Sequence, residues 1–285
     1  MSQTIWSGIT IGSVYALIAL GFTLIYNVSK IINIAQGEFL MIGAMSFYTF
    51  NSVLGFPLYA AIPISMLITA VVGWLMVKLS INLLRDNSHV VAIIVTIAFG
   101  EILKGASLLV WGKNTVGIPA LSKGESIEIM QAYVQPQTFV IMIVTLCVCL
   151  AFSLLMSKTN IGKAMLAASG DAYAAKLMGI NIKLLVVISF AVSAVIGALA
   201  GILVGPLTMM GYSQGTLLGI KGFIAALLGG MGGYAGAVLG GLVLGLLEAF
   251  GSGYISALLK DAFAFAVLLI VLIVKPSGLI KNKAD

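Results

Sequence analysis

The sequence is poor in charged residues: Asp, Glu, Lys and Arg make up 8% of its 285 residues, whereas 61% are hydrophobic. A soluble domain usually carries about a quarter charged residues. Apolar runs recur along nearly the whole length, and a helix that crosses a bilayer needs roughly 20 predominantly apolar residues. The composition therefore excludes a soluble domain and predicts an all-α integral membrane protein, with a single transmembrane domain over residues 1–285.

Residues that ligate metals or act as nucleophiles are also scarce. The two cysteines, Cys147 and Cys149, lie in one apolar run with a single residue between them. On a helix they point about 200° apart, which excludes a disulfide or a shared metal. One histidine supplies neither a metal cluster nor a Ser/His pair at membrane depth. We therefore expect no metal, no cofactor and no catalytic residue in this chain.

No charged residue occurs between Met1 and Asn27. A cleavable signal peptide has a basic region before its apolar core, so we expect this first apolar segment to remain as an anchor. The formal net charge of +6 would indicate an acidic partner in a soluble protein. In a membrane protein it reports topology instead, because Lys and Arg accumulate in cytoplasmic loops. The charge therefore does not imply a nucleic-acid partner.

About nine membrane-crossing helices are predicted from the apolar segments, some of them short or broken. The segments are 4–26, 38–54, 58–80, 90–111, 136–157, 183–205, 217–232, 236–256 and 260–274. An odd number of crossings places the two termini on opposite sides of the membrane.

Basic residues orient these crossings. Between Lys158 and Lys183 there are four lysines against one aspartate, and Lys78 and Arg85 flank another joint. The positive-inside rule places both joints in the cytoplasm. Counting outward predicts an external N-terminus and a cytoplasmic tail, whose lysines are Lys275, Lys281 and Lys283. The same count makes 111–135 the longest external loop, for which we expect a short helix.

A short internal repeat relates two distant segments. Ala35–Leu40 (AQGEFL) aligns with Ser213–Leu218 (SQGTLL), with Gln, Gly and Leu in common. In the predicted topology the first falls at the inner side of the membrane and the second at the outer side. Such an arrangement is typical of inverted-topology repeats. An inverted repeat is therefore a hypothesis, with chance similarity as its alternative.

The stretch LLGGMGGYAGAVLGGLVLG, residues 227–245, contains eight glycines and no charge. Its apolar neighbours exclude a flexible linker, and it lacks the GxxxxGK[ST] pattern of a phosphate loop. Glycines about one turn apart form grooves that let another helix approach closely. We predict helix packing at Gly229, Gly233, Gly236, Gly240, Gly241 and Gly245. The dense part, 229–236, also predicts a tight turn between two close-packed crossings.

Polar groups at membrane depth are costly and are therefore candidates for a translocation path or its gate. Seven residues qualify: Asn33, Gln36, Glu38, Glu101, Lys104, Lys221 and Glu248. Glu101 and Lys104, three residues apart, either neutralise each other or line a path. The same two interpretations hold for Lys221 and Glu248, which lie in neighbouring crossings. Glu38 and its neighbours either form a gate or complement the dipole at a helix N-terminus.

The inner loop 157–183 is long and positively charged, and its small apolar residues recur at helical spacing. Gly179 is placed to end its last helix. Small residues suit docking into a groove on another protein, whereas a helix in the membrane surface usually carries bulkier apolar residues. We predict a docking segment, with an interfacial helix as the alternative. The predicted contact residues are Gly170, Asp171, Ala172, Ala175, Met178 and Gly179.

Three motifs carry a family resemblance. The pattern ASGDAYAAKLMGIN, followed by a crossing and KGFIAALLGGMGGYAGAVLGGLVLG, resembles the permease subunits of bacterial ABC importers for branched-chain amino acids. The N-terminal GSVYALIALGFTLIYNVSKIINIAQGEFLMIGA resembles the same subunits, so the likeness covers nearly the whole chain. Members of this family often have Asn-x-Ala-His-Gly-Glu where this chain has Asn33 to Glu38. Gln36 stands in place of the histidine, which removes any titratable role at that position.

The resemblance implies a multi-pass protein of the bacterial inner membrane. Its partners would be a second related permease subunit, two cytoplasmic ATPase subunits and an extracytoplasmic solute-binding protein. The ATPase subunits would bind ATP and Mg²⁺, and the loop 157–183 would couple them to the membrane helices. This chain lacks a phosphate loop and would pass branched-chain or other hydrophobic amino acids without catalysis. Glycine-faced helices would rock between outward-open and inward-open packings.

Two other interpretations stay open. Related permeases for urea, short amides or aromatic acids share the same motifs, and nothing in this sequence separates them. A passive channel or an ion-coupled carrier would instead use Glu101, Lys104 and Glu248 for ions. Such a carrier has no reason to build a docking segment at 158–183.

Overall fold

The structure is a computed structural model of the chain. It describes residues 1–285 apart from 82–88, 123, 130, 256–259, 276–277 and 280–285. Three basic residues used to orient the crossings, Arg85, Lys281 and Lys283, lie outside the described residues.

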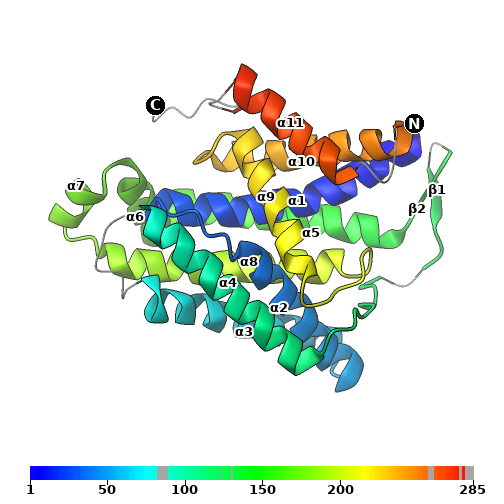
Figure 1. Cartoon of the computed structure of the whole chain (residues 1–285), viewed down its shortest axis with the longest axis horizontal. Helices are drawn as coiled ribbons and strands as arrows, with labels where there is room; N and C mark the ends of the chain where they lie inside the picture. The colour runs from blue at the N-terminus through cyan, green and yellow to red at the C-terminus, as the bar shows by residue number, and fades with distance from the viewer. Residues whose placement is uncertain (82–88, 123, 130, 256–259, 276–277, 280–285) are drawn as a thin grey trace.

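The described residues form eleven α-helices, one π-helical turn and a β-hairpin (Figure 1). The helices are α1 (Ser2–Ser29), α2 (Gln36–Tyr48), the π-helical turn η1 (Thr49–Val53), α3 (Leu58–Leu79), α4 (His89–Trp111), α5 (Pro136–Lys158), α6 (Asn160–Gly170), α7 (Ala172–Leu177), α8 (Ile182–Val204), α9 (Gln214–Gly229), α10 (Tyr234–Tyr254) and α11 (Lys260–Val274). Each predicted crossing contains one α-helix, followed in 38–54 by η1, and α6 and α7 lie in the predicted inner loop. The prediction of an all-α membrane protein is confirmed.

Fewer helices have full spanning length than the nine crossings that we expected. Six in the described part of the chain are long and apolar enough to cross a membrane: α1, α3, α4, α5, α8 and α10. The other three, α2, α9 and α11, have 13, 16 and 15 residues. These lengths are short of the roughly 20 residues that a helix needs to cross the hydrocarbon core. Helix α2 continues directly into η1.

Helix α1 lies at the centre of the fold. In a highly apolar stretch of 18 residues, 89% of the positions are buried in α1, against 17% in α4. It packs against α5, α8, α9 and α10. A helix that is buried on all sides is typically hydrophobic all round rather than amphipathic, as α1 is. Small residues allow this close packing: a Cβ on Gly12 would lie 2.9 Å from the Cα of Leu242 in α10. Polar side chains in its buried part, among them Thr10, Ser13 and Thr23, therefore lie inside the protein.

The glycine-rich stretch forms the α9–α10 hairpin. Gly230 and Gly232, in the turn, have φ values of 94° and 100°, a region that suits glycine alone. Gly233 is the N-cap of α10. A Cβ on any of five other glycines would lie within 2.3 Å of a neighbouring backbone atom: Gly229, Gly236, Gly240, Gly241 and Gly245. Backbone atoms cannot move aside as a side chain end can, so these positions sit at direct helix–helix contacts.

The expected helix in the external loop is wrong, because the structure has a β-hairpin there. Strand β1 (Ile127–Ile129) pairs antiparallel with β2 (Ala132–Val134), with Glu128 opposite Tyr133. Ala132 and Val134 are buried whereas Tyr133 is exposed, so side chains alternate with the period of a strand. Gln131, with a φ of 63°, lies in the connection.

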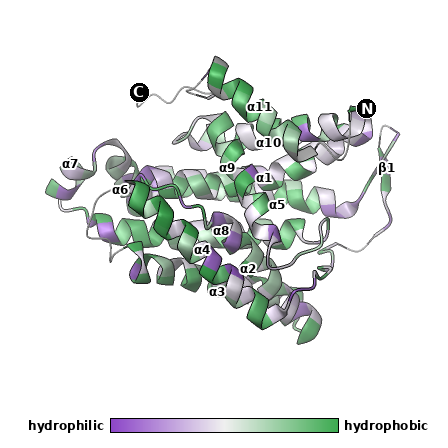
Figure 2. Cartoon of the chain, viewed as in Figure 1, coloured by the Kyte–Doolittle hydropathy of each residue, from purple (hydrophilic) through white to green (hydrophobic). Residues whose placement is uncertain are grey.

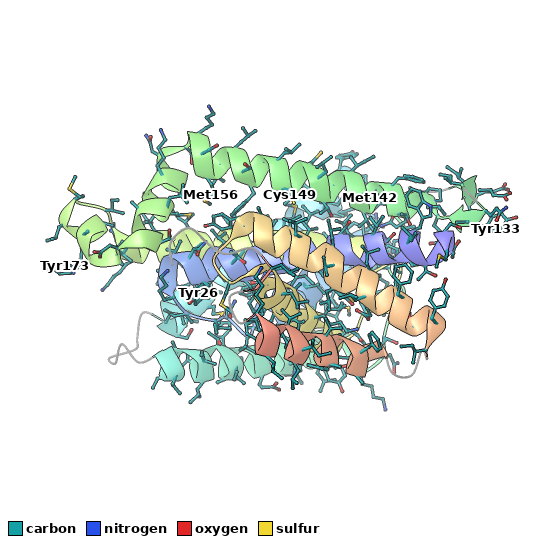
Figure 3. All side chains as sticks on the ribbon, turned by 90° about the horizontal axis from the view of Figure 1, so that it is seen from above. Tyr26, Tyr133, Met142, Cys149, Met156 and Tyr173 are labelled. Carbon is teal, nitrogen blue, oxygen red and sulfur yellow. The ribbon has the colours of Figure 1, made fainter. Side chains whose placement is uncertain are left out.

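The hairpin and α7 lie at opposite ends of the molecule. Tyr133 marks one end and Tyr173 of α7 the other (Figure 3). The N-terminus lies at the hairpin end (Figure 1). Hydrophobic residues dominate the helices between these ends, among them α4, α5 and α11 (Figure 2). The predicted external and inner loops are therefore separated by the length of the helical body.

Candidate functional site

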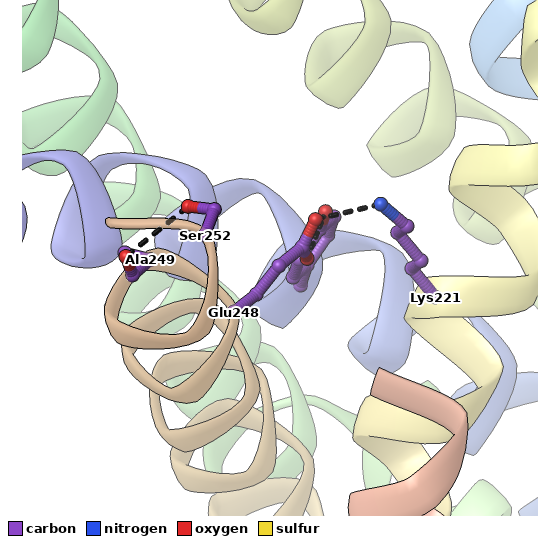
Figure 4. Close-up of polar contacts among 5 residues, drawn as sticks. Lys221, Glu248, Ala249 and Ser252 are labelled. Atoms are coloured by element: carbon purple, nitrogen blue, oxygen red, sulfur yellow. Dashed lines mark hydrogen bonds and ion pairs between the residues drawn. The ribbon is translucent and has the colours of Figure 1, made fainter. Parts of the chain in front are cut away.

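A buried ion pair joins α9 and α10. Lys221 Nζ lies 2.7 Å from Glu248 Oε1 (Figure 4). The hydroxyl of Tyr15, from α1, donates a hydrogen bond to Glu248 Oε2 over 2.7 Å. The Glu248 side chain is 1% exposed and that of Lys221 is 12% exposed. Each carboxylate oxygen therefore has a partner, and we call these three residues the Glu248 cluster.

Small residues bring the three helices of this cluster together. Gly245 precedes Glu248 by less than one turn, and a Cβ there would lie 2.3 Å from the Cα of Gly12. On α9, Gly222 lies next to Lys221 and faces Ile18 of α1. A Cβ added to Gly222 would lie 2.2 Å from the Cγ2 of Ile18. The two backbones touch at Gly245, and at Gly222 only the Ile18 side chain lies between the helices, so the charged groups of α9 and α10 reach each other and α1.

A cavity of about 210 Å³ opens between the first part of α1 and the last part of α10. Glu248 lies in its wall, together with Gly245 and Ala249 of the same helix. The wall on the α1 side includes Thr4 and Ser7. The cavity is at the end of the molecule that holds the N-terminus, and the Glu248 cluster lies at its side.

A second buried carboxylate lies where α2 and α9 begin. Glu38, 3% exposed, accepts a hydrogen bond on Oε1 from the hydroxyl of Thr216 over 2.7 Å. Its Oε2 has no hydrogen-bond partner among the described residues. It belongs to the first turn of α2 but makes no capping hydrogen bond with the backbone. The side chain of Glu38 is therefore hydrogen-bonded to α9 and does not cap its own helix.

The two segments of the internal repeat meet at this place. Helices α2 and α9 both begin at the glutamine of the shared Gln-Gly pair, Gln36 and Gln214. A Cβ on Gly37 would lie 2.1 Å from the carbonyl oxygen of Gly215. The hydrogen bond between Glu38 and its repeat equivalent extends this contact. The aligned residues are thus neighbours in space at matching helix starts.

The other polar candidates of this region hold the start of α2 in place. The Gln36 amide nitrogen donates to the Ser193 carbonyl oxygen over 3.2 Å, and the Ser193 hydroxyl donates to Gln36 Oε1 over 2.7 Å. Asn33 Oδ1 accepts from the backbone N–H of Ala35 over 3.2 Å, as a local turn residue does. Both side chains are fully buried.

Glu101 and Lys104 form an ion pair within α4, with 2.6 Å between Nζ and Oε1. Their side chains are 64% and 20% exposed, so this pair lies on the outside of the helical body. The structure does not bring it into the Glu248 cluster. Gly100, next to Glu101 in α4, lies near α2: a Cβ added to it would lie 3.7 Å from the Cγ of Glu38.

The predicted docking segment consists of α6 and α7. The Asp171 carboxylate accepts from the backbone N–H groups of Tyr173 and Ala174 and so caps the start of α7. Gly179 follows α7 with a φ of 84°, the left-handed conformation that ends a helix. Of the predicted contact residues, Ala175 is buried, and the others are exposed: Gly170, Asp171, Ala172, Met178 and Gly179. Most of this set therefore faces outward at the end of the molecule.

Three residues of the candidate site were not predicted from the sequence: Tyr15, Thr216 and Ser193. Each sits in an apolar helix and is a partner of a predicted residue from a distant part of the chain. Thr216 has a detectable signal, because it aligns with Glu38 in the repeat. For Tyr15 the only signal is a phenol within an apolar run, where a buried hydroxyl needs a partner.

The fold and these buried polar clusters define a multi-pass membrane protein with a glycine-packed interior. A family model described as branched-chain amino acid transport system / permease component matches residues 4–272. The chain belongs to this family.

Curated relatives cover almost the whole chain. The high-affinity branched-chain amino acid transport system permease protein LivH of Escherichia coli K12 is 34% identical, over 98% of this chain and 94% of its own length. The permease protein BraD of Pseudomonas aeruginosa is 32% identical, over 98% and 95%. A probable branched-chain amino acid transport permease protein LivH of Methanocaldococcus jannaschii is 26% identical, over 92% and 87%.

A solved structure shares the fold. It is PsaBC from Streptococcus pneumoniae in complex with Fab, which superposes with a TM-score of 0.53 at 16% identity. The match covers 97% of this chain and 92% of that chain. At this identity the likeness concerns the arrangement of helices.

Proposed function

We propose that this chain is the transmembrane permease subunit of an ATP-binding-cassette importer that passes branched-chain or other hydrophobic amino acids into the cytoplasm. The observation that carries the proposal is the near full-length similarity to LivH, 34% identical over 98% of this chain. The family match over residues 4–272 supports it independently of any one relative.

The proposed assembly contains a second related permease subunit, two cytoplasmic ATPase subunits and an external solute-binding protein. ATP and Mg²⁺ bind to the ATPase subunits, and this chain has no catalytic role. The chain lies in the bacterial inner membrane with its N-terminus outside and its C-terminus in the cytoplasm. The distance between the β-hairpin and α7 supports this topology, because it leaves one end for the binding protein and the other for the ATPases (Figure 3).

Helices α6 and α7 act as the coupling segment in this proposal. The side chains of Tyr173, Leu177 and Met178 are 73%, 71% and 84% exposed. Such apolar exposure at the end of a membrane protein suits insertion into a cleft of a partner. On the other side, Met165 and Ala168 of α6 are buried against the helical body. Movement of the ATPase is thereby transmitted to the membrane helices through a packed contact.

The transport step follows from the packing of the interior. Helices α1, α9 and α10 touch at backbone level through glycines, so small rotations change their contacts without opening large voids. Closure of the ATPases on ATP draws the coupling segments together, and the glycine-faced helices alternate between outward-open and inward-open packings. Selection among amino acids lies mainly with the binding protein.

Purification of the intact complex through a tag on this chain tests the proposal. We expect the ATPase subunits and the second permease to copurify, and the binding protein to contain a branched-chain or other hydrophobic amino acid. Uptake by the reconstituted complex should then require ATP and that binding protein. A binding protein loaded with urea, a short amide or an aromatic acid would redirect the substrate assignment. Uptake driven by an ion gradient without ATP would overturn the proposal.

A further inference from the structure

We infer that Lys30 is a positioning residue for transport: it ties the coupling segment to the end of α1, and through that end to α2 and to the α9–α10 hairpin. This inference rests on the proposed function, in which the ATPase subunits move α6 and α7. Lys30 directly follows the last residue of α1, and its side chain reaches α6.

Lys30 makes a direct polar contact with the coupling segment. Its Nζ donates a hydrogen bond to the carbonyl oxygen of Ser169 over 3.0 Å. Ser169 lies in the last turn of α6, where a helix has carbonyl groups without partners of its own and a partial negative charge. An ammonium group is favourable at such a helix end. The same ammonium lies 5.5 Å from the centre of the Tyr26 ring, in the last turn of α1.

The backbone of Lys30 adopts a conformation that glycine adopts more easily. Its φ is 57° and its ψ is 16°, the left-handed region, at the C-cap of α1. Among the described residues, Gln131 is the one other non-glycine residue with a positive φ. A side chain in this region costs free energy that glycine avoids. The presence of lysine at this helix end therefore favours a role for its side chain.

Residues 27–34, which we call the α1 junction, also contact other helices. The side-chain amide of Asn27 donates to the carbonyl oxygen of Gly232, in the turn of the α9–α10 hairpin, over 2.9 Å. The backbone N–H of Ile34 donates to the hydroxyl of Thr96, in α4, over 3.2 Å. Helix α2 begins two residues after Ile34. A displacement of α6 that reaches the α1 junction therefore acts on α2, on α4 and on the hairpin.

The hydrogen bond of Lys30 adds direction to a contact that is otherwise apolar. Met165 and Ala168 of α6 are buried against the helical body. Apolar packing has no directional preference, whereas a hydrogen bond weakens steeply when its atoms are displaced. Lys30 therefore fixes the position of α6 along the end of α1, so that the two segments move together.

The main test is Lys30→Met in the complete complex, reconstituted in liposomes with its binding protein. The side chain is exposed and methionine keeps an apolar stem, so the complex should assemble and hydrolyse ATP. Methionine cannot donate to Ser169. We expect the ratio of leucine imported to ATP hydrolysed to fall at least about threefold, a modest share of what a hydrogen bond to a charged group contributes. Lys30→Arg keeps a charged donor and should restore most of the ratio.

Two further variants separate the side chain from the backbone and from the charge. Lys30→Gly removes the side chain but suits the left-handed backbone, so it should lower the ratio as Lys30→Met does. Lys158→Met removes an exposed lysine at the end of α5 whose side chain makes no hydrogen bond or ion pair with another described residue, and it should keep the wild-type ratio. A wild-type ratio in Lys30→Gly, or an equal fall in Lys158→Met, would overturn the inference.

Amide hydrogen exchange on the wild-type complex keeps the test decisive if the Lys30 variants do not assemble. We expect a non-hydrolysable ATP analogue to change the protection of residues 160–170 and of the α1 junction together. A change confined to 160–170 would overturn the inference.

The outcomes distinguish this inference from the proposed function. A wild-type ratio of leucine imported to ATP hydrolysed in the assembled Lys30→Met complex would overturn the role of Lys30 and leave the proposed function intact. Absence of ATP-driven amino-acid uptake by the wild-type complex would overturn both.

Discussion

Two ion pairs among the described residues have nearly the same length and opposite surroundings. Glu101 and Lys104 lie on one helix, 2.6 Å apart, with 64% of the glutamate side chain exposed. Lys221 and Glu248 come from two helices, 2.7 Å apart, with the glutamate 1% exposed. The first pair is local and needs only α4. The second exists only when α9, α10 and α1 are in place.

The location of an ion pair within one helix or between helices therefore decides how much of the fold the pair depends on. A pair within one helix turn forms wherever the helix forms and contributes a few tenths of a kcal/mol, roughly 0.2–0.5. A buried pair between helices loses its hydration and is sensitive to every contact that positions it. Variants that change one pair and leave the other intact measure how much each pair contributes to stability and to uptake.

The largest effect is expected from Gly245→Leu. Its Cβ would enter the backbone of Gly12, so α1 and α10 must separate and the contact of Tyr15 with Glu248 is lost. Overpacking costs about 1–3 kcal/mol even in cores that can adjust, and here backbone blocks adjustment. We expect almost no folded, monodisperse chain in detergent by size-exclusion chromatography. The control, Gly105→Leu beside Lys104, meets nothing within 4 Å and should give wild-type yield.

The next effect is expected from Lys221→Met. It leaves the Glu248 carboxylate buried without its cation, which costs about 3–5 kcal/mol. The melting temperature of the purified chain should fall, and adding Glu248→Gln should restore most of the loss. The equivalent change at the exposed pair, Lys104→Met, should leave the melting temperature within a few degrees of the wild type. Equal destabilisation by the two lysine variants would remove the contrast on which this account depends.

A change in α7, at the end of the molecule opposite the N-terminus, distinguishes assembly of the complex from coupling of uptake to ATP hydrolysis. Asp171→Ala removes the two hydrogen bonds that cap α7, at a cost of about 1 kcal/mol to that helix. Both ion pairs remain intact, so the complex should assemble while ATP hydrolysis no longer drives uptake efficiently. The ratio of solute imported to ATP hydrolysed should fall, and Asp171→Asn, which keeps a capping oxygen, should restore much of it. An unchanged ratio in Asp171→Ala would count against α7 as the coupling element.

The smallest effect is expected from Glu101→Gln/Lys104→Met. An exposed pair contributes about 0–1 kcal/mol, so stability and leucine uptake should remain close to wild type. Transport assays on the reconstituted complex measure the outcome. Complete loss of uptake with normal assembly would instead make α4 a lining of the translocation route.

The sequence predicts the helical segments because apolar runs of sufficient length leave no other structure in a membrane. It also predicts the turn after Gly229 and the end of α7 at Gly179, where backbone conformation demands glycine. It does not predict that α4 is peripheral and α1 central, since both are equally apolar and lipid-facing residues resemble buried ones. The contact of Tyr15 with Glu248 joins residues 233 positions apart, so it depends on the helix arrangement.

The central claim is that this chain is a passive permease moved by partner ATPases. The most direct measurement is uptake and ATP hydrolysis by proteoliposomes that contain this chain alone, compared with liposomes that contain the whole complex and its binding protein. We predict neither ATP hydrolysis nor concentrative uptake by the chain alone, and both by the complex. Concentrative uptake of an amino acid by the chain alone would contradict the account.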